Sequence, residues 1–158
     1  MHCLDAVSGQ VLFRSNEVAN GHHYFISPIP LLNIQSKIGA YILLASQQGK
    51  LTVLDMHNHH LQIKSAPVVQ FSSTLLQIAS VADPSKGSRN TILCTLDSGE
   101  LCSLHLVLRD KEWKAQDCRV LHSFDSTQSH ALCTDCNGHI FAGTRDDTLY
   151  AFSYSLPR

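Results

Sequence analysis

Three segments of the chain repeat one pattern of hydrophobic and polar positions. Segments 42–55, 92–105 and 140–153 each hold an apolar run, a short polar turn and a second apolar run. A short apolar run bounded by turn residues is typical of a buried strand, so each segment predicts a strand, a tight turn and a second strand. The segments begin 50 and 48 residues apart, and Leu4 stands 50 residues before Leu54 in the same frame. A fixed period of this length indicates an array of repeated units.

The residues of each turn support this interpretation. Gly49 and Gly99 give the backbone the freedom that a tight turn requires. Asp146 and Asp147 take this place in the third repeat, where Asp accepts left-handed conformations better than most residues.

A further hairpin is predicted upstream of the third repeat. Asn137 and Gly138 are the preferred pair for a type I′ turn, in which both residues have positive φ. We therefore expect a strand over 131–135 to pair with the strand over 140–144.

The chain as a whole predicts an all-β fold, because it contains no convincing amphipathic helix. A polar loop over 83–90 separates two more predicted strands, 75–81 and 91–96. Short strands at this spacing favour a sandwich or a β-propeller, and the period decides for the propeller. The chain supplies about three four-stranded antiparallel blades, whereas a closed ring usually needs about four to eight. We expect residues 1–158 to form a partial β-propeller, the C-terminal blades of a larger ring, with completion by another chain as the alternative.

Composition and charge indicate which classes of binding partner to expect. The 158 residues carry 12 Lys and Arg against 13 Asp and Glu, a balance without the basic footprint of a nucleic-acid or membrane-surface protein. No stretch reaches the roughly 18 apolar residues of a membrane span, and no signal peptide begins the chain. The 6 cysteines are scattered through strand-like sequence, which suits a reducing compartment. We expect a cytoplasmic protein that binds neither nucleic acid nor membranes.

The repeats resemble a known family of blades. The pattern of a strand, a Gly turn and Leu-Tyr-Ala-Leu-Asp is present in variant form over 2–9, 49–55 and 142–152. It is similar to pyrroloquinoline-quinone-type repeats of quinoprotein-dehydrogenase-like propellers, and among these the chain looks most like the C-terminal propeller of multidomain acyl-adenylating enzymes of the acyl-CoA synthetase family. The sequence departs from the pattern at Phe13 and Ile63, where Trp is expected.

The resemblance implies a fold more strongly than an activity. Quinoprotein dehydrogenases hold their cofactor between a Trp and a disulfide of adjacent cysteines, beside a calcium ion. This chain has a single Trp, Trp113, and no Cys-Cys pair. The adenylating domains of the acyl-CoA synthetase relatives have no counterpart here. We therefore expect no bound cofactor and assign no catalytic residue.

One cluster has the ligand types that zinc prefers: His130, Cys133, Cys136 and His139, spaced at intervals of three. Two structures compete for this segment. A zinc knuckle would bring the four together but break the predicted hairpin, whereas the hairpin places residues three apart on opposite faces of a strand. We expect the hairpin, with Cys133 in the blade core, His130 and His139 exposed, and no bound metal.

Two hypotheses for function follow. The first is a non-catalytic module that binds a protein or another domain of its parent chain, with the loop over 83–90 and the histidine-rich segment 57–60 as contact segments. A second histidine cluster lies at 22–23, and none of these supplies a closed ligand set. The parent would be an acyl-adenylating, acyl-CoA synthetase-like enzyme. The alternative is a stand-alone WD-repeat-like scaffold, although no Trp-Asp dipeptide occurs.

Overall fold

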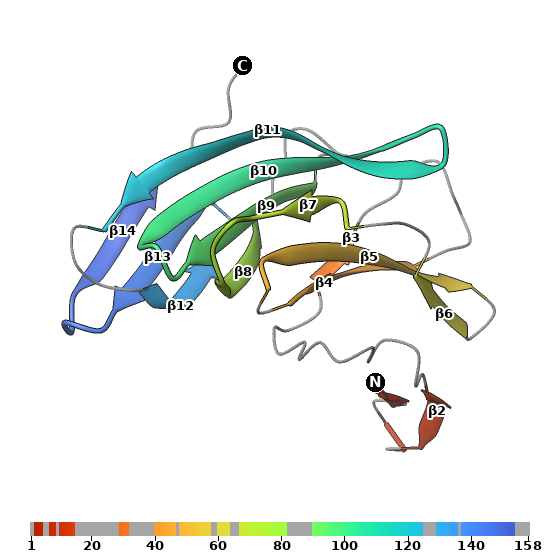
Figure 1. Cartoon of the computed structure of the whole chain (residues 1–158). Helices are drawn as coiled ribbons and strands as arrows, with labels where there is room; N and C mark the ends of the chain where they lie inside the picture. Colours follow the sequence, from red (N-terminus) through yellow and green to blue (C-terminus); the bar gives the residue numbers. More distant parts are fainter. Residues whose placement is uncertain are drawn as a thin grey trace.

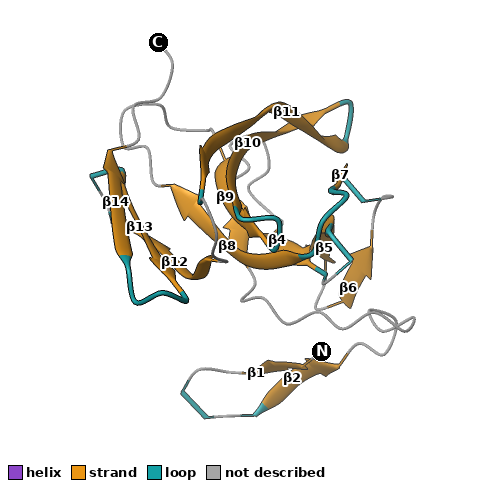
Figure 2. Cartoon of the chain, turned by 60° about the vertical axis from the view of Figure 1, so that its left-hand side comes forward, coloured by secondary structure: helices purple, strands orange, loops and turns teal. Residues whose placement is uncertain are grey.

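The computed structural model of the chain is built from antiparallel β-sheets (Figures 1 and 2). It describes residues 2–4, 7, 8, 10–14, 29–31, 40–46, 48–57, 60–63, 67–81, 90–124, 129–135 and 137–153, and these contain no helix. The predicted all-β class is therefore confirmed.

Fourteen strands are described. Their bounds are β1 His2–Leu4, β2 Val11–Arg14, β3 Ile29–Leu31, β4 Ala40–Ala45, β5 Lys50–His57, β6 His60–Ile63, β7 Val69–Gln70, β8 Leu75–Val81, β9 Asn90–Leu96, β10 Glu100–Arg109, β11 Glu112–Ser123, β12 Ser129–Thr134, β13 His139–Thr144 and β14 Leu149–Ser153.

These strands form four sheets in chain order. The hairpin β1–β2 is followed by the first large sheet, β3–β4–β5–β6, in which β7 also pairs with β5. The central sheet is β8–β9–β10–β11, and the last sheet is β12–β13–β14. The central sheet has the four strands predicted for each blade. In the last sheet, three strands are described.

The three repeats pair in one register. Ile42 lies opposite Leu54 in the first, Ile92 opposite Leu104 in the second and Ile140 opposite Phe152 in the third. Each pair joins the first residue of its segment to the thirteenth. The alignment made from the hydrophobic pattern is therefore confirmed at the level of individual residues.

The same type of turn connects the two strands in each of the three repeats. A backbone bond from Gly49 N–H to Ser46 O has its counterpart from Gly99 N–H to Leu96 O, and the two glycines have φ of 77° and 86°. Asp147, at the same place in the third repeat, has φ of 59°. Three-residue loops whose last residue is left-handed are a common hairpin connection, and Asp is tolerated there. The turn predictions for all three repeats are confirmed.

The turn between β12 and β13 corrects a prediction. The N–H of Asp135 bonds the O of His139, and the N–H of Gly138 bonds the O of Asp135. The loop therefore has three residues, 136–138, and ends on Gly138 with φ of 83°. The predicted two-residue type I′ turn is wrong, because pairing closes one residue earlier, at Asp135. The predicted pairing of the two strands is confirmed.

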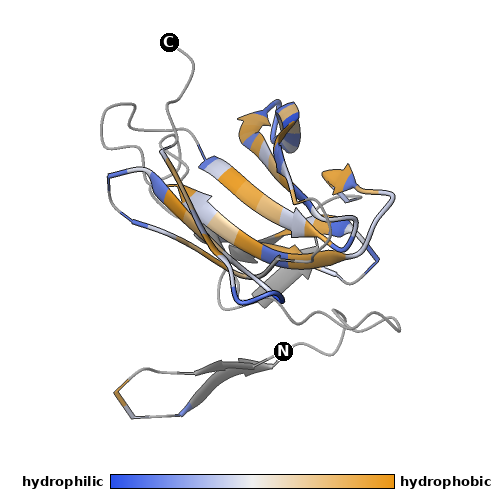
Figure 3. Cartoon of the chain, turned by 90° about the vertical axis from the view of Figure 1, so that its left-hand side faces the viewer, coloured by the Kyte–Doolittle hydropathy of each residue, from blue (hydrophilic) through white to orange (hydrophobic). Residues whose placement is uncertain are grey.

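The central sheet is covered on both faces. Every residue of β9 is buried. Even-numbered side chains such as Ile92 and Leu104 pack on Leu43 and Leu51 of the first large sheet, in one hydrophobic core. Leu93 and Leu101 point the other way, and form a second core with side chains of the last sheet that include Ile140 and Ala142. Figure 3 shows hydrophobic residues along the strands, and in the central sheet successive side chains point to opposite faces and so supply both cores.

Burial of the equivalent residues Leu54, Leu104 and Phe152 is expected from the repeat alignment. Leu104 is fully buried, and Phe152 is partly buried against the second core. The side chain of Leu54 lies outside the described residues.

Candidate functional site

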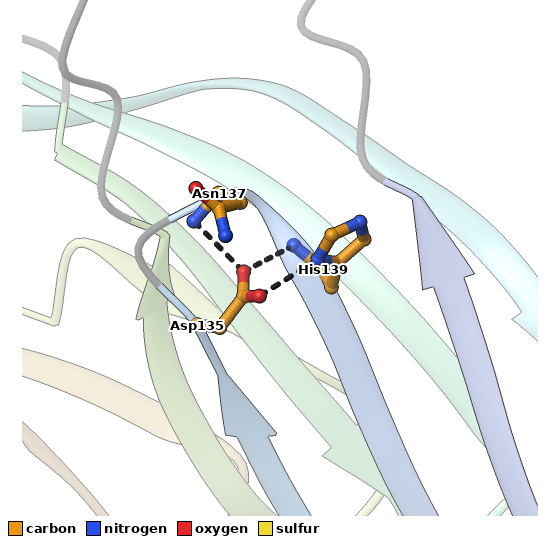
Figure 4. A network of polar contacts seen from close by, with 3 residues as sticks. All are labelled: Asp135, Asn137 and His139. Atoms are coloured by element: carbon orange, nitrogen blue, oxygen red, sulfur yellow. Dashed lines mark hydrogen bonds and ion pairs between the residues drawn. The ribbon is translucent and has the colours of Figure 1, made fainter.

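The segment from His130 to His139 contains a network of hydrogen bonds around one carboxylate (Figure 4). Oδ1 of Asp135 accepts from the backbone N–H of Asn137 at 2.9 Å and of His139 at 2.8 Å, and Oδ2 accepts from Nδ1 of His139 at 2.7 Å. The bonds from the side chain and backbone of His139 are the main causes that lower the pKa of Asp135 to about 2. These three bonds stabilise the loop between β12 and β13, and they use one of the two ring nitrogens of His139.

The structure describes the side chains of two of the four candidate ligands, Cys133 and His139. The side chains of His130 and Cys136 lie outside the described residues, and His139 is exposed as predicted. Cys133 is exposed rather than in the core, because β12 directs it to the outward face of the last sheet. Among the described residues, no three His, Cys, Asp or Glu side chains are grouped to hold a metal ion. The absence of a metal stays a prediction.

Trp113 and the two buried thiols, Cys94 and Cys102, belong to the packing of the sheets. Trp113 is buried in the first core, with its ring 5.3 Å from that of Tyr41 in an edge-to-face contact. Burial raises the pKa of Cys94 well above its usual value and that of Cys102 to about 11. A thiol held in the protonated form is a poor nucleophile, so these two cysteines are suited to packing rather than to redox chemistry.

The predicted contact segments are described only in part. His57 and His60 pair across the β5–β6 hairpin, but their side chains and residues 58–59 are outside the described residues. Residues 22–23 and 82–89 also lie outside the described residues. Asn90, the last residue of the predicted loop, belongs to β9. Within the described part of the chain, no helix has the length and apolar character of a membrane span.

The outward face of the last sheet carries exposed apolar side chains. We call it the open face, and define it by residues of β12, β13 and β14 that point away from the second core. Leu149 is 71% exposed, and Phe141 is half-buried. The pairing of β12, β13 and β14 places three more exposed residues beside them: Ala131, Cys133 and Ala151.

The repeat register identifies what the open face corresponds to in the other sheets. Phe141 and Leu149 are equivalent to Leu93 and Leu101 in the central sheet, and to Leu43 and Leu51 in the first large sheet.

All four of these leucines are 0% exposed, because the next sheet along the chain covers them. In the last repeat, the same two positions face outward without such a cover among the described residues. The open face is therefore the surface on which each earlier sheet receives its successor.

An exposed flank on the last hairpin is what a partial array of blades predicts. The repeat alignment places Phe141 and Leu149 at the positions of two buried pairs, and in the structure both lie on that flank, with Leu149 exposed and Phe141 half-buried. Exposed apolar residues that are contiguous are the informative kind, since isolated ones are common on any protein.

Comparisons with known proteins bear on the fold. No protein-family model matches the chain, and no curated protein matches it. The chain is similar to a chain in the complex structure of the fission yeast SREBP-SCAP binding domains, with a TM-score of 0.53 and 16% sequence identity. The match covers 99% of this chain and 44% of that chain, so this chain spans less than half the length of the one it resembles. At this identity, the likeness concerns the fold.

Proposed function

We propose that the chain is a protein-binding module of propeller-type blades whose open face binds a further antiparallel sheet of the same repeat type. Three observations support the propeller-type arrangement. The repeats follow a period of 50 and 48 residues, their hairpins share one register, and successive sheets stack face to face through the two cores. Such repetition is typical of propellers.

The single observation that carries the proposal is the equivalence between the open face and two buried faces. Leu149 is 71% exposed, whereas its equivalents Leu51 and Leu101 are 0% exposed. Each fully buried Leu side chain contributes about 1.5–3 kcal/mol through the hydrophobic effect. A sheet with the same inward pattern as β13 and β14 would recover this contribution at Leu149 and Phe141.

The parent protein remains an expectation from the sequence. An acyl-adenylating parent of the acyl-CoA synthetase family would use the module for interdomain binding, and the stand-alone WD-repeat-like scaffold would use it between proteins. The structure that the chain resembles in fold is a complex of binding domains, which is consistent with a binding role. No catalytic or cofactor-binding residue is part of the proposal.

Protection of Cys133 tests the proposal. Cys133 lies on the open face, whereas Cys118 is exposed on β11, outside this face, and serves as the matched control. Maleimide labelling at each site would be mapped by mass spectrometry in the purified 158-residue chain and in the native assembly isolated from cells. We expect Cys133 to react in the chain alone and to be protected at least tenfold in the assembly, with Cys118 labelled in both. Equal labelling of Cys133 in the two samples would overturn the proposal.

A further inference from the structure

The last sheet ends at an edge where the other repeats have another strand. In the central sheet, β10 pairs with β9 on one side and with β11 on the other. In the first large sheet, β5 pairs with β4 on one side and with β6 and β7 on the other. The equivalent strand β14 pairs with β13, and its other edge meets no further strand among the described residues.

The backbone groups at this edge follow from the pairing. The N–H of Thr144 bonds the O of Thr148, and in an antiparallel pair the bonded residues alternate. Tyr150 and Phe152 therefore direct their N–H and C=O groups toward β13. Leu149, Ala151 and Ser153 direct theirs outward. Their strand, 149–153, has no charged residue and no Pro, the devices that usually protect an edge from pairing.

A pocket of about 360 Å³ lies beside this edge, and β11 lines its other side. Leu101, Ile140 and Phe152 contribute apolar side chains, Ser153 lies at the β14 edge, and β11 contributes Val120, Leu121 and Arg119, the charged residue of the lining. Ring contacts hold the two strands together at one end, with His122 of β11 at 5.1 Å from Phe152. Figure 1 shows this end of β11 beside β14.

We propose that an extended segment of a partner protein binds this groove as an antiparallel fourth strand on β14. Its backbone pairs with Leu149, Ala151 and Ser153, one apolar side chain enters the pocket, and a carboxylate lies near Arg119. Strand addition to a free sheet edge is an established mode of peptide recognition, in which main-chain bonds give affinity and pockets for alternate side chains give specificity. The inference extends the proposed binding function to a second surface.

A lone strand fits this groove better than a second copy of the chain. In each copy, β11 lies beside the edge of its own β14 and lines the pocket there. Antiparallel pairing of two β14 strands keeps the same faces of both sheets on one side, so both β11 strands would be crowded against the one shared edge. An extended segment brings no second β11 to this edge, and a carboxylate on it complements the positive charge of Arg119.

Hydrogen exchange measured by NMR with synthetic probes tests the inference. The probe is a ten-residue peptide of alternating valine and glutamate; one control has lysine in place of glutamate, and another has two central prolines that remove backbone donors. We expect the first peptide to slow exchange of Leu149, Ala151 and Ser153 at least tenfold, with no change at Tyr150 and Phe152. The lysine peptide should protect less, and Arg119→Gln should remove that difference. The proline peptide should give no protection.

Other outcomes would overturn it. Absence of protection at Leu149, Ala151 and Ser153 with the glutamate peptide would exclude strand addition. Protection in the dilute chain without peptide would show that a segment of the chain itself fills the edge, and protection that grows with chain concentration alone would identify a second copy. Since Cys133 reports on the open face and these amides on the edge, failure here leaves the labelling test of the proposed function independent.

Discussion

Replacing Leu104 with alanine should lower the free energy of unfolding by about 2–5 kcal/mol, the cost of comparable large-to-small changes in well-packed cores. Leu104 is fully buried in the first core, between the central sheet and the first large sheet. The loss combines the apolar surface no longer buried with the cavity left between two sheets that cannot close onto each other.

Denaturant unfolding followed by fluorescence of Trp113, which packs in the same core, would measure this change. Val120→Ala is the matched control, since Val120 is 51% exposed and should cost less than about 0.5 kcal/mol. A Leu104→Ala variant as stable as the Val120→Ala variant would show that the sheets do not stack through this core.

Gly49→Ala should destabilise the protein by at least about 2 kcal/mol, because two effects act together. Gly49 has φ of 77°, in a region that costs a residue with a Cβ about 1–2 kcal/mol. A Cβ at this position would also lie 2.5 Å from the O of Ser73 and 2.7 Å from the O of Phe71, both backbone atoms that cannot turn aside. The N–H of Phe71 bonds the O of Gly49, which holds that segment against the turn.

Asp147 provides the control for this prediction. It occupies the equivalent place with φ of 59°, so the third repeat already accommodates a side chain there. Asp147→Gly should therefore leave stability unchanged or raise it by up to about 1 kcal/mol. Thermal unfolding of both variants would separate the effects, and a neutral Gly49→Ala would contradict the described contact between the turn and residues 71–73.

The sequence predicts the local part of this structure well because hairpins are encoded by neighbours in the chain. The apolar runs and turn residues foretell the register that joins Ile92 to Leu104, since the loop length and the hydrophobic pattern fix which residues pair. The form of the turn at 135–139 was not predicted, because it depends on the carboxylate of Asp135 accepting hydrogen bonds from Asn137 and His139. The preference of Asn-Gly for a two-residue turn does not take these hydrogen bonds into account.

Packing between sheets was harder to predict than pairing within them. Cys133 has the character of a core residue, but it is exposed because its sheet has no described neighbour on that side. The groove beside β14 likewise lies between β11 and an edge where no fourth strand is described. Both features depend on how many strands and sheets follow, and a local hydrophobic pattern carries no information on that number.

Residue-resolved hydrogen exchange of the purified chain tests the stacking of repeated sheets most directly. Amides of β9 and β10 should exchange most slowly, close to the rate set by global unfolding, because sheets cover both of their faces. Amides of the last sheet should exchange faster, since its open face leaves Leu149 in water. Exchange in β9 and β10 that is as fast as in β13 and β14 would contradict the stacking from which the open face and its proposed function are inferred.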